Sequence, residues 1–493
     1  MPTLTIDGRP VEVEKGTTLL EAAQKLGVYI PRYCYHPKLS ISGNCRMCLV
    51  EVEKAPKLVT ACSTEAAEGM SVKTTSDKVK AARRDVLEYL LINHPLDCPI
   101  CDQAGECGLQ DYYMEYSLAK SRFGQADKVR RQKRRALGPH LVLDNERCIL
   151  CTRCVRFCSE VTKTSELDVM GRGDHSHIDL KEGKALDNGY SLNIADICPV
   201  GAWTSRDFRF KQRVWFLKKT PTICLGCATG CLVEAHHNEN TIYRLVPRPN
   251  PETNTWLCDH GRLTYKAVQA GDRLTKGVIK NGLIDFEPAL REAAARIDEA
   301  RGAGAVAVLG SPWLSIEDNA ALARLAKDAL KTENYCFDFN FEQGIKDGIL
   351  INKDSAPNAN GTKLVKAAHG GLSLEELSRR ITSGQIKVLL VEARAAGLIK
   401  DAVKAASPKL IVFASNRGEI PAGAYDTLPY ASYFETPGTF INYQGLRRRT
   451  EPSVEAPEGV KPLWTVVNKL AAYSGTSLRL DSAEDALKGI EFK

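Results

Sequence analysis

Alternating apolar and polar positions open the chain and predict a β-hairpin. The segments "TLTID" and "PVEVE" each alternate, and they flank a Gly-Arg turn. Thr18 and Glu21 then have the spacing of a capping box, and Gly27 is placed to end the helix that they begin. The first 30 residues or so are therefore expected to form two antiparallel strands followed by a helix.

A second helical pattern lies in "KAARRDVLEYLLIN", residues 80–93. It places Ala82, Val86 and Leu90 along one helix face. Pro95 is expected to stop this helix, because proline lacks the backbone N–H that the next turn needs. His94 is then expected at the helix C-terminus.

The second half of the chain has a different pattern. Helical segments such as "EPALREAAARIDEA" and "SIEDNAALARLAKDAL" alternate with the apolar strands "AVAVLG", "KVLLVE" and "KLIVFA". Near-continuous apolar strands between helices predict a parallel α/β sheet that is covered on both faces. The glycines of "GAGAVA" precede their strand, whereas phosphate-binding glycines follow one, so no dinucleotide site is predicted.

Composition indicates a folded, water-soluble chain. It has 493 residues, of which 43% are hydrophobic and 26% charged. No apolar run approaches the roughly 18 residues of a membrane span. The N-terminus lacks the apolar stretch of a signal peptide. We therefore expect a cytosolic chain, or one attached to a cytosolic membrane face.

Cysteine content changes the picture. Sixteen of the 17 cysteines lie between Cys34 and Cys258, and only Cys336 follows. In a reducing compartment, cysteines at short regular spacings are metal ligands rather than disulfides. The first half is therefore predicted to bind metal.

The first cysteine group combines a CxxC in "SGNCRMCLVEV" with one earlier and one later cysteine. Plant-type ferredoxins hold a [2Fe-2S] cluster in this way, although the gap before the CxxC is ten residues here instead of four. With the hairpin and helix before it, the group predicts a β-grasp ferredoxin domain over residues 1–78. Its predicted ligands are Cys34, Cys45, Cys48 and Cys62.

The second group, in "NHPLDCPICDQAGECGLQD", has three cysteines and no fourth nearby. One interpretation of His94 is that its imidazole interacts with the negative end of the helix dipole. The other is that it ligates iron, because imidazole replaces thiolate in Rieske centres. The cysteine triplet favours a four-ligand set made of His94, Cys98, Cys101 and Cys107.

The third group, "RCILCTRCVRFCSE", has the CxxCxxCxxxC spacing of a [4Fe-4S] ferredoxin. Cys158 is followed by Ser159, whereas Cys198 in "ADICPVGAW" is followed by Pro199, as fourth ligands in ferredoxins are. Cys158 is therefore predicted to be a small buried apolar residue. The predicted ligands are Cys148, Cys151, Cys154 and Cys198.

The fourth group joins "TICLGCATGC" to the distant "WLCDHGR". Four thiolates at this spacing also suit a zinc ribbon, and that alternative stays open. The neighbouring iron-sulfur patterns favour a further [4Fe-4S] cluster. Its predicted ligands are Cys224, Cys227, Cys231 and Cys258.

Taken in order, "SGNCRMCLVEV", "NHPLDCPICDQAGECGLQD", "CILCTRCVRFCSE" and "CPVGA" resemble the large iron-sulfur subunits of NADH-quinone oxidoreductase, respiratory complex I. The resemblance covers residues 1 to about 270. In that family the histidine ligates a [4Fe-4S] cluster, which implies this role for His94, and some bacterial members have the fourth cysteine set. The resemblance implies one [2Fe-2S] and three [4Fe-4S] clusters that relay electrons, with no substrate site in this chain.

Partners and location also follow from the resemblance. It implies an FMN- and NADH-binding subunit upstream, further iron-sulfur subunits downstream toward quinone, and a peripheral position on the cytoplasmic side of the bacterial inner membrane, with no transmembrane segment. The segment "LPYASYFETPGTFINYQGLRRR" resembles a stretch shared with molybdopterin oxidoreductases. The C-terminal region is much shorter than their catalytic body, which implies a reduced scaffold without that cofactor.

The predicted fold is therefore a multidomain chain of α+β and α/β type. Its expected domains are a [2Fe-2S] domain at 1–78, a [4Fe-4S] domain with one histidine and three cysteine ligands at 79–141, a ferredoxin-type [4Fe-4S] domain at 142–216, a molybdopterin-oxidoreductase-type [4Fe-4S] domain at 217–272 and a cofactor-free α/β domain at 273–493.

A basic run, "KVRRQKRR" at residues 128–135, could indicate nucleic-acid binding. Four oxidised clusters with their thiolates carry roughly −7. The formal charge of the chain, counted with neutral thiols, is +7. Because the two nearly cancel, we predict a solvated or partner-facing loop and no nucleic-acid partner.

Three other function classes remain open from the residues. One is the equivalent relay subunit of an NAD-linked hydrogenase or formate dehydrogenase. Another is a molybdenum catalytic subunit, for which no metal-ligating residue is evident in the C-terminal half. The last is a nucleic-acid-binding iron-sulfur protein.

Overall fold

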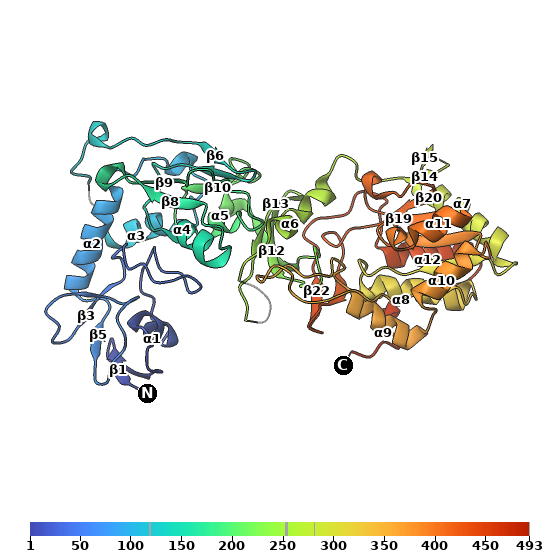
Figure 1. Cartoon of the computed structure of the whole chain (residues 1–493), viewed down its shortest axis with the longest axis horizontal. Coiled ribbons are helices and arrows are strands. Elements are labelled where there is room, and N and C mark those ends of the chain that lie inside the picture. The colour runs from blue at the N-terminus through green and yellow to red at the C-terminus, as the bar shows by residue number, and fades with distance from the viewer. Residues whose placement is uncertain (118–119, 252–254, 281, 493) are drawn as a thin grey trace. The chain divides into compact units, whose positions relative to one another are not determined.

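The computed structural model describes residues 1–117, 120–251, 255–280 and 282–492. The chain divides into two compact units, Met1–Leu217 and Lys218–Lys493 (Figure 1). None of the helices in the described ranges has both the length and the apolar character needed to cross a membrane.

The N-terminal segment forms a five-stranded sheet with strand order β2-β1-β5-β3-β4. Its strands are β1 (Thr3–Ile6), β2 (Arg9–Glu12), β3 (Leu49–Val52), β4 (Val59–Thr60) and β5 (Ser71–Lys73). β1 pairs antiparallel with β2 and parallel with β5. The hairpin is confirmed, but its turn is Asp7-Gly8 rather than Gly-Arg, because these two residues have positive φ (48° and 78°) and Arg9 already pairs in β2.

Helix α1 (Leu19–Lys25) packs on this sheet through Leu19 and Leu20, which share a core with Leu4 and Val72. The predicted capping box is confirmed. The Thr18 backbone N–H donates to Glu21 Oε2 at 2.9 Å, and the Glu21 N–H donates to Thr18 Oγ1 at 3.3 Å. Gly27 follows the helix with φ +71°, a conformation that glycine adopts without strain.

Helix α2 (Asp77–Leu91) is confirmed, and Ala82, Val86 and Leu90 are half-buried along it. Val79, Arg83 and Leu87 are buried. Arg83 is only 1% exposed. Its guanidinium lies over the Tyr116 ring and donates to the Leu49 carbonyl oxygen at 3.3 Å. The sequence did not indicate that Arg83 is buried, because an arginine is expected at the surface until its partners are known.

The rest of the first unit consists of short elements that carry the cysteine loops. Its helices are η1 (Cys98–Ile100), α3 (Gly108–Tyr116), η2 (Gln125–Asp127), α4 (Arg153–Arg156), the π-helical η3 (Phe157–Val161), η4 (Gly173–His175), α5 (Asn193–Ile197) and η5 (Val214–Phe216). Its strands are β6 (Arg135–Leu137), β7 (Leu141–Leu143) and β10 (Trp203–Ser205) in one sheet and β8 (Leu167–Met170) with β9 (His177–Leu180) in another.

The second unit begins with an antiparallel sheet of β11 (Lys218–Ile223), β12 (Leu232–Asn238) and β13 (Thr241–Pro247), followed by α6 (Asp259–Arg262) and η6 (Thr264–Gln269). A seven-stranded sheet follows, in the order β15-β14-β20-β19-β18-β16-β17. Its strands are β14 (Gly277–Ile279), β15 (Gly282–Ile284), β16 (Val306–Leu309), β17 (Tyr335–Cys336), β18 (Val388–Glu392), β19 (Lys409–Ala414) and β20 (Ala424–Pro429).

Five of these strands, β16 to β20, are parallel, as the apolar runs predicted. The β14-β15 hairpin adds two antiparallel strands at one edge, which the prediction had missed. A small sheet of β21 (Gly438–Ile441) and β22 (Arg447–Thr450) and the turn η9 (Arg417–Glu419) lie outside the large sheet.

Helices cover both faces of the large sheet (Figure 1). Along β18, Val388 and Leu390 face one core, and Leu389 and Val391 face the other. The first core includes residues of α7 (Phe286–Arg301), α8 (Ile316–Arg324), η7 (Leu325–Ala329), α9 (Ala359–His369), α12 (Leu463–Tyr473) and α13 (Ala483–Ala486). The second includes residues of α10 (Leu374–Thr382), η8 (Ala395–Ile399) and α11 (Lys400–Ala406).

Candidate iron-sulfur sites

The first cysteine group is assembled by the sheet of the N-terminal segment. Cys48 directly precedes β3 and Cys62 follows β4, and the pairing of these strands brings the two cysteines to the same end. Cys34 and Cys45 come from the loop between α1 and β3. Hydrogen bonds from the thiols of Cys45 and Cys62 lower the pKa of Cys34, and one from Cys62 lowers that of Cys48 to about 7. All four predicted ligands therefore lie together.

The second group begins with His94, three residues after the last residue of α2. Burial, assisted by the positive charges of Lys128 and Arg147, lowers the pKa of the His94 imidazole to about 4. The ring is therefore neutral at pH 7. Its Nδ1 is buried and has no hydrogen-bond partner among the described residues. A neutral imidazole with an unpartnered ring nitrogen fits a metal ligand.

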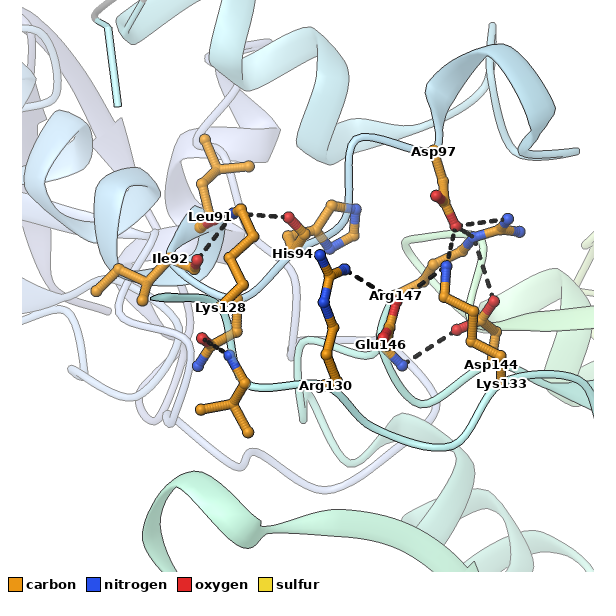
Figure 2. Close-up of polar contacts among 12 residues, drawn as sticks. Leu91, Ile92, His94, Asp97, Lys128, Arg130, Lys133, Asp144, Glu146 and Arg147 are labelled. Atoms are coloured by element: carbon orange, nitrogen blue, oxygen red, sulfur yellow. Dashed lines mark hydrogen bonds and ion pairs between the residues drawn. The ribbon is translucent and has the colours of Figure 1, made fainter. Parts of the chain in front are cut away.

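Lys128 takes the role that the helix-dipole interpretation had given to His94 (Figure 2). Its ammonium group donates to the carbonyl oxygens of Leu91, Ile92 and His94 at 2.9, 2.8 and 3.0 Å. These carbonyl groups lie at the C-terminal end of α2 or just beyond it, where no N–H group of a following helical turn is present to bind them. The neutral imidazole does not supply the positive charge that the dipole interpretation requires.

The three cysteines of this group lie at the start of η1, at its end and at the N-cap of α3. Cys98 and Cys101 are close enough to Cys107 to raise its pKa electrostatically, although burial is the larger cause and brings that pKa to about 11. Arg147 interacts electrostatically with both His94 and Cys101. The structure thus brings the cysteines together and places His94 and Cys101 around one guanidinium.

The third group surrounds a small buried cavity of about 10 Å³. The cysteines that line it are Cys148, Cys151, Cys154 and Cys198. Burial raises the pKa of Cys148 and of Cys151 to about 12. Such thiols stay protonated until a metal displaces the proton. The donor set, rather than the volume, fits an iron-sulfur cluster here.

Cys158 lies outside this lining. It is fully buried in η3, and burial followed by the Glu166 carboxylate raises its pKa. The structure therefore groups Cys198, and not Cys158, with the CxxCxxC triplet.

One loop separates the second site from the third. Residues 198–201 begin with Cys198, and the Pro199 carbonyl oxygen lies 4.0 Å from Cys107 Sγ. A Cβ atom at Gly201 would overlap the sulfur of Cys101. The loop that carries a predicted ligand of the third site therefore also lines the second.

Two arginines of α4 connect the third site to the first. Arg156 Nη2 donates to the carbonyl oxygens of Cys34 at 2.6 Å and Cys151 at 3.1 Å. Arg153 donates to the carbonyl oxygens of Tyr35 at 2.6 Å and Ile197 at 2.8 Å. The spacing of the cysteines did not indicate these contacts, because each joins segments that are far apart in the chain.

The fourth group lies in the second unit and surrounds a cavity of about 160 Å³. The cysteines that line it are Cys224, Cys227, Cys231 and Cys258. The Gly226 N–H donates to Cys224 Sγ at 3.4 Å and the Gly261 N–H to Cys258 Sγ at 3.3 Å. Backbone N–H groups that point at sulfur are among the features that set cluster potentials.

The zinc alternative requires four sulfurs about 2.3 Å from one ion. The cysteines of the fourth group border a cavity, which suits a body larger than one ion.

A larger cavity of about 440 Å³ adjoins the fourth site, and both linings include Gly226 and His260. Its lining contains no cysteine in the described residues but includes Arg394 and Asp318. Burial raises the pKa of Asp318 to about 6. These residues lie on separate elements, so no local sequence pattern indicates this cavity.

Four family models match the chain. They are a 2Fe-2S iron-sulfur cluster binding domain (residues 1–77), the iron-sulfur binding region of NADH-ubiquinone oxidoreductase-G (83–122), the ferredoxin-like domain of NADH-quinone oxidoreductase subunit 3 (138–204) and the molybdopterin oxidoreductase Fe4S4 domain (217–270). The cysteine-rich half therefore contains one 2Fe-2S domain and several domains of the 4Fe-4S type.

Curated relatives match more of the chain. The NADH-quinone oxidoreductase G subunit of Streptomyces coelicolor is 39% identical over 342 residues, which are 68% of this chain and 40% of that protein. The G subunit of Rickettsia conorii is 38% identical, over 71% of this chain and 53% of that protein. The mitochondrial NADH-ubiquinone oxidoreductase 78 kDa subunit of Neurospora crassa is 45% identical, over 58% of this chain and 38% of that protein.

This chain thus spans about half the length of these relatives, or less. Among solved structures, a chain of an NAD+-reducing [NiFe]-hydrogenase is 32% identical. The match covers 43% of this chain and 91% of that chain, with a TM-score of 0.38.

Proposed function

Since this chain is a homologue of the G subunits of NADH-quinone oxidoreductase, we propose that it relays electrons from NADH oxidation toward quinone within a multisubunit complex. The relay has no substrate site in this chain. The observation that carries the proposal is the linkage of three cysteine sites in the first unit. The 198–201 loop joins the second site to the third, and Arg156 joins the third to the first.

The proposed cofactors are one [2Fe-2S] and three [4Fe-4S] clusters, each of which accepts and donates one electron when bound. The domains that hold them are proposed at 1–78, 79–141, 142–216 and 217–272, followed by a cofactor-free scaffold at 273–493 with a reduced molybdopterin-oxidoreductase fold. The proposed ligands are Cys34, Cys45, Cys48 and Cys62 for the first site; His94, Cys98, Cys101 and Cys107 for the second; Cys148, Cys151, Cys154 and Cys198 for the third; and Cys224, Cys227, Cys231 and Cys258 for the fourth.

The protein contributes ligands, water exclusion and charge. Most of the cysteines are buried, which keeps water from the sites. Arg147 lies beside the second site, and Arg153 lines the third. Their positive charges offset the negative charge of thiolate-ligated iron and favour the reduced state, since net charge and hydrogen bonding set the potential of a cluster.

The proposed partners are the FMN- and NADH-binding subunit upstream and iron-sulfur subunits downstream, with the chain held peripherally at the cytoplasmic face of the inner membrane. Purification from membranes with identification of the co-purifying chains tests this assignment. Co-purification with a hydrogenase or formate dehydrogenase subunit instead would contradict it.

Iron analysis tests the cofactor set. The anaerobically purified chain is expected to contain about 14 irons if all four sites are filled as proposed. About ten irons with one zinc would assign the Cys224 group to a structural metal. The relay itself predicts that NADH bleaches the visible absorption of the clusters only after the flavin partner is added. A fully loaded chain that is not reduced under those conditions would contradict the proposal.

A further inference from the structure

The basic run at residues 128–135 was predicted to be a solvated or partner-facing loop, and the structure corrects this in part. Arg130, Gln132 and Arg134 are exposed, but the residues between them are at least half-buried, and Lys128 is only 8% exposed. The segment is thus an extended strap in which exposed residues alternate with half-buried ones. Figure 2 shows Arg130 pointing toward Glu146, with which it pairs at 3.8 Å.

The first contact of this strap is with the residues around His94. The three carbonyl oxygens that Lys128 binds, those of Leu91, Ile92 and His94, use all three donors of its ammonium group. The Val129 N–H also donates to Asn93 Oδ1 at 3.0 Å. The strap therefore holds both the end of α2 and the backbone of the histidine itself.

The second contact lies just before Cys98. Lys133 Nζ pairs with Asp97 Oδ2 at 2.7 Å and with Glu146 Oε2 at 2.9 Å. Arg147 donates to the same Asp97 oxygen from Nε at 3.0 Å and from Nη2 at 2.9 Å. Asp97, Arg147 and Glu146 have little exposed side-chain surface, so these charge-assisted bonds are poorly screened by water.

The strap thus fixes the chain on both sides of the Pro95-Leu96 dipeptide. We propose that residues 128–133 are a positioning strap for the second iron-sulfur site, in which Lys128 and Lys133 hold His94 and the Cys98 loop so that the imidazole reaches the same cluster as the cysteines. This inference rests on the proposed ligation by His94. It assigns a role to the basic run at residues 128–135, which the electron-relay function does not otherwise use.

The strap is needed because a ligand side chain binds metal only when it points in the right direction. A histidine ligand has to point one ring nitrogen at iron, and its direction depends on the backbone that carries it. Groups behind the ligands commonly fix this direction and tune the metal. Here the Lys128 ammonium replaces the missing turn of α2 and stops residues 92–94 from fraying. Removing its donors would leave three carbonyls without partners.

The test compares three variants of the full chain, labelled with ¹⁵N-histidine and purified anaerobically. Lys128→Met keeps the length of the side chain but removes its donors. Lys128→Arg restores a charge and donors. Arg134→Met is the matched control, since it removes one positive charge from the same segment, and among the described residues Arg134 forms no ion pair or side-chain hydrogen bond.

Pulsed EPR of the reduced second cluster measures its coupling to imidazole nitrogen, which reports ligation directly. We expect the coupling to be lost or broadened in Lys128→Met, retained in Arg134→Met and at least partly restored in Lys128→Arg. Amide hydrogen exchange of residues 92–98 is expected to be about tenfold faster in Lys128→Met, since bonds to a charged donor are lost.

Lys133→Met provides a second variant in case Lys128→Met does not fold. It breaks the strap's contacts with Asp97 and Glu146 and is expected to broaden the same coupling. Unchanged coupling and exchange in both lysine variants, or equal effects in Arg134→Met, would overturn the strap. Absence of imidazole coupling in the wild-type chain would instead refute the proposed ligation by His94, so the two failures can be told apart.

Discussion

At the scale of single residues, Lys128 binds the end of α2, and the His94 imidazole stays free for another role. Its place before Pro95 made His94 a candidate for the end of α2, and the three cysteines after it made it a candidate metal ligand. In the structure the carbonyls of the helix end accept from Lys128, and the imidazole stays neutral with one ring nitrogen unpartnered among the described residues. The local sequence could not decide between these roles, because Lys128 lies 34 residues further along the chain.

Substitution of His94 tests its ligation. Thiolate is anionic where imidazole is neutral, so His94→Cys is expected to keep the cluster, make it more negative by about one charge and lower its reduction potential. His94→Ala is expected to leave one iron without a protein ligand and to lose or degrade the cluster. Iron content and redox-titrated EPR spectra of both variants measure this. Unchanged spectra and iron content in both variants would contradict ligation by His94.

The pair Cys158 and Cys198 gives a matched test of the third site. Cys198→Ala is expected to abolish one [4Fe-4S] EPR signal, because this thiol lines the cavity of the CxxCxxC triplet. Cys158→Ala is expected to leave every cluster in place, since Cys158 lies beside Glu166 and outside that lining. The opposite pattern would exchange the two assignments.

At the scale of elements, predictions that depended on local patterns succeeded. The hairpin, the capping box of α1, the existence of α2 and the parallel strands of the second unit all follow from side-chain spacing within one segment. The exact turn of the hairpin, the burial of Arg83 in α2 and the edge hairpin β14-β15 do not. They depend on backbone conformation and on partners such as Tyr116 and Leu49, which the linear pattern does not contain.

The capping box offers a test of local stability. Thr18→Ala removes the oxygen that accepts the Glu21 N–H, and loss of such a cap costs about 1 kcal/mol. The urea midpoint for loss of visible absorption from the N-terminal [2Fe-2S] site should fall accordingly. Thr17→Ala is the control, since among the described residues the Thr17 hydroxyl forms no hydrogen bond, while its backbone oxygen accepts from the Ala66 N–H. Equal shifts in the two variants would contradict the importance of the cap.

For the cysteine sites, too, local spacing was informative and contacts between distant segments were not predictable. Three cysteine triplets and one CxxC pair could be grouped from spacing alone because short loops hold them. The remote cysteine Cys198 was assigned from the proline that follows it, and Cys258 was assigned as the one distant cysteine of the fourth group. The positions of Arg156 and Gly201 could not be predicted, because their importance arises from contacts across more than 90 residues of sequence.

At the scale of the whole molecule, the two units differ in chemistry. The first holds three linked cysteine sites, and the second combines one cysteine site with a large α/β sheet. The sequence also offered a molybdenum catalytic subunit as an alternative for the second unit. We predict that the purified chain lacks stoichiometric molybdenum, tungsten and pterin, because no metal-ligating residue was evident in the sequence of the C-terminal half.

Elemental analysis by mass spectrometry, with fluorescence of the oxidised pterin as a second readout, measures this. Molybdenum at one atom per chain would contradict the scaffold interpretation and would make the 440 Å³ cavity beside the fourth site a catalytic pocket.

The short loop from Cys198 to Gly201 also makes two sites depend on one segment of the chain. Its first residue, Cys198, is a proposed ligand of the third site, while Pro199 and Gly201 lie against sulfurs of the second site. We therefore expect a substitution at Gly201 to disturb both sites at once, because one short loop serves both.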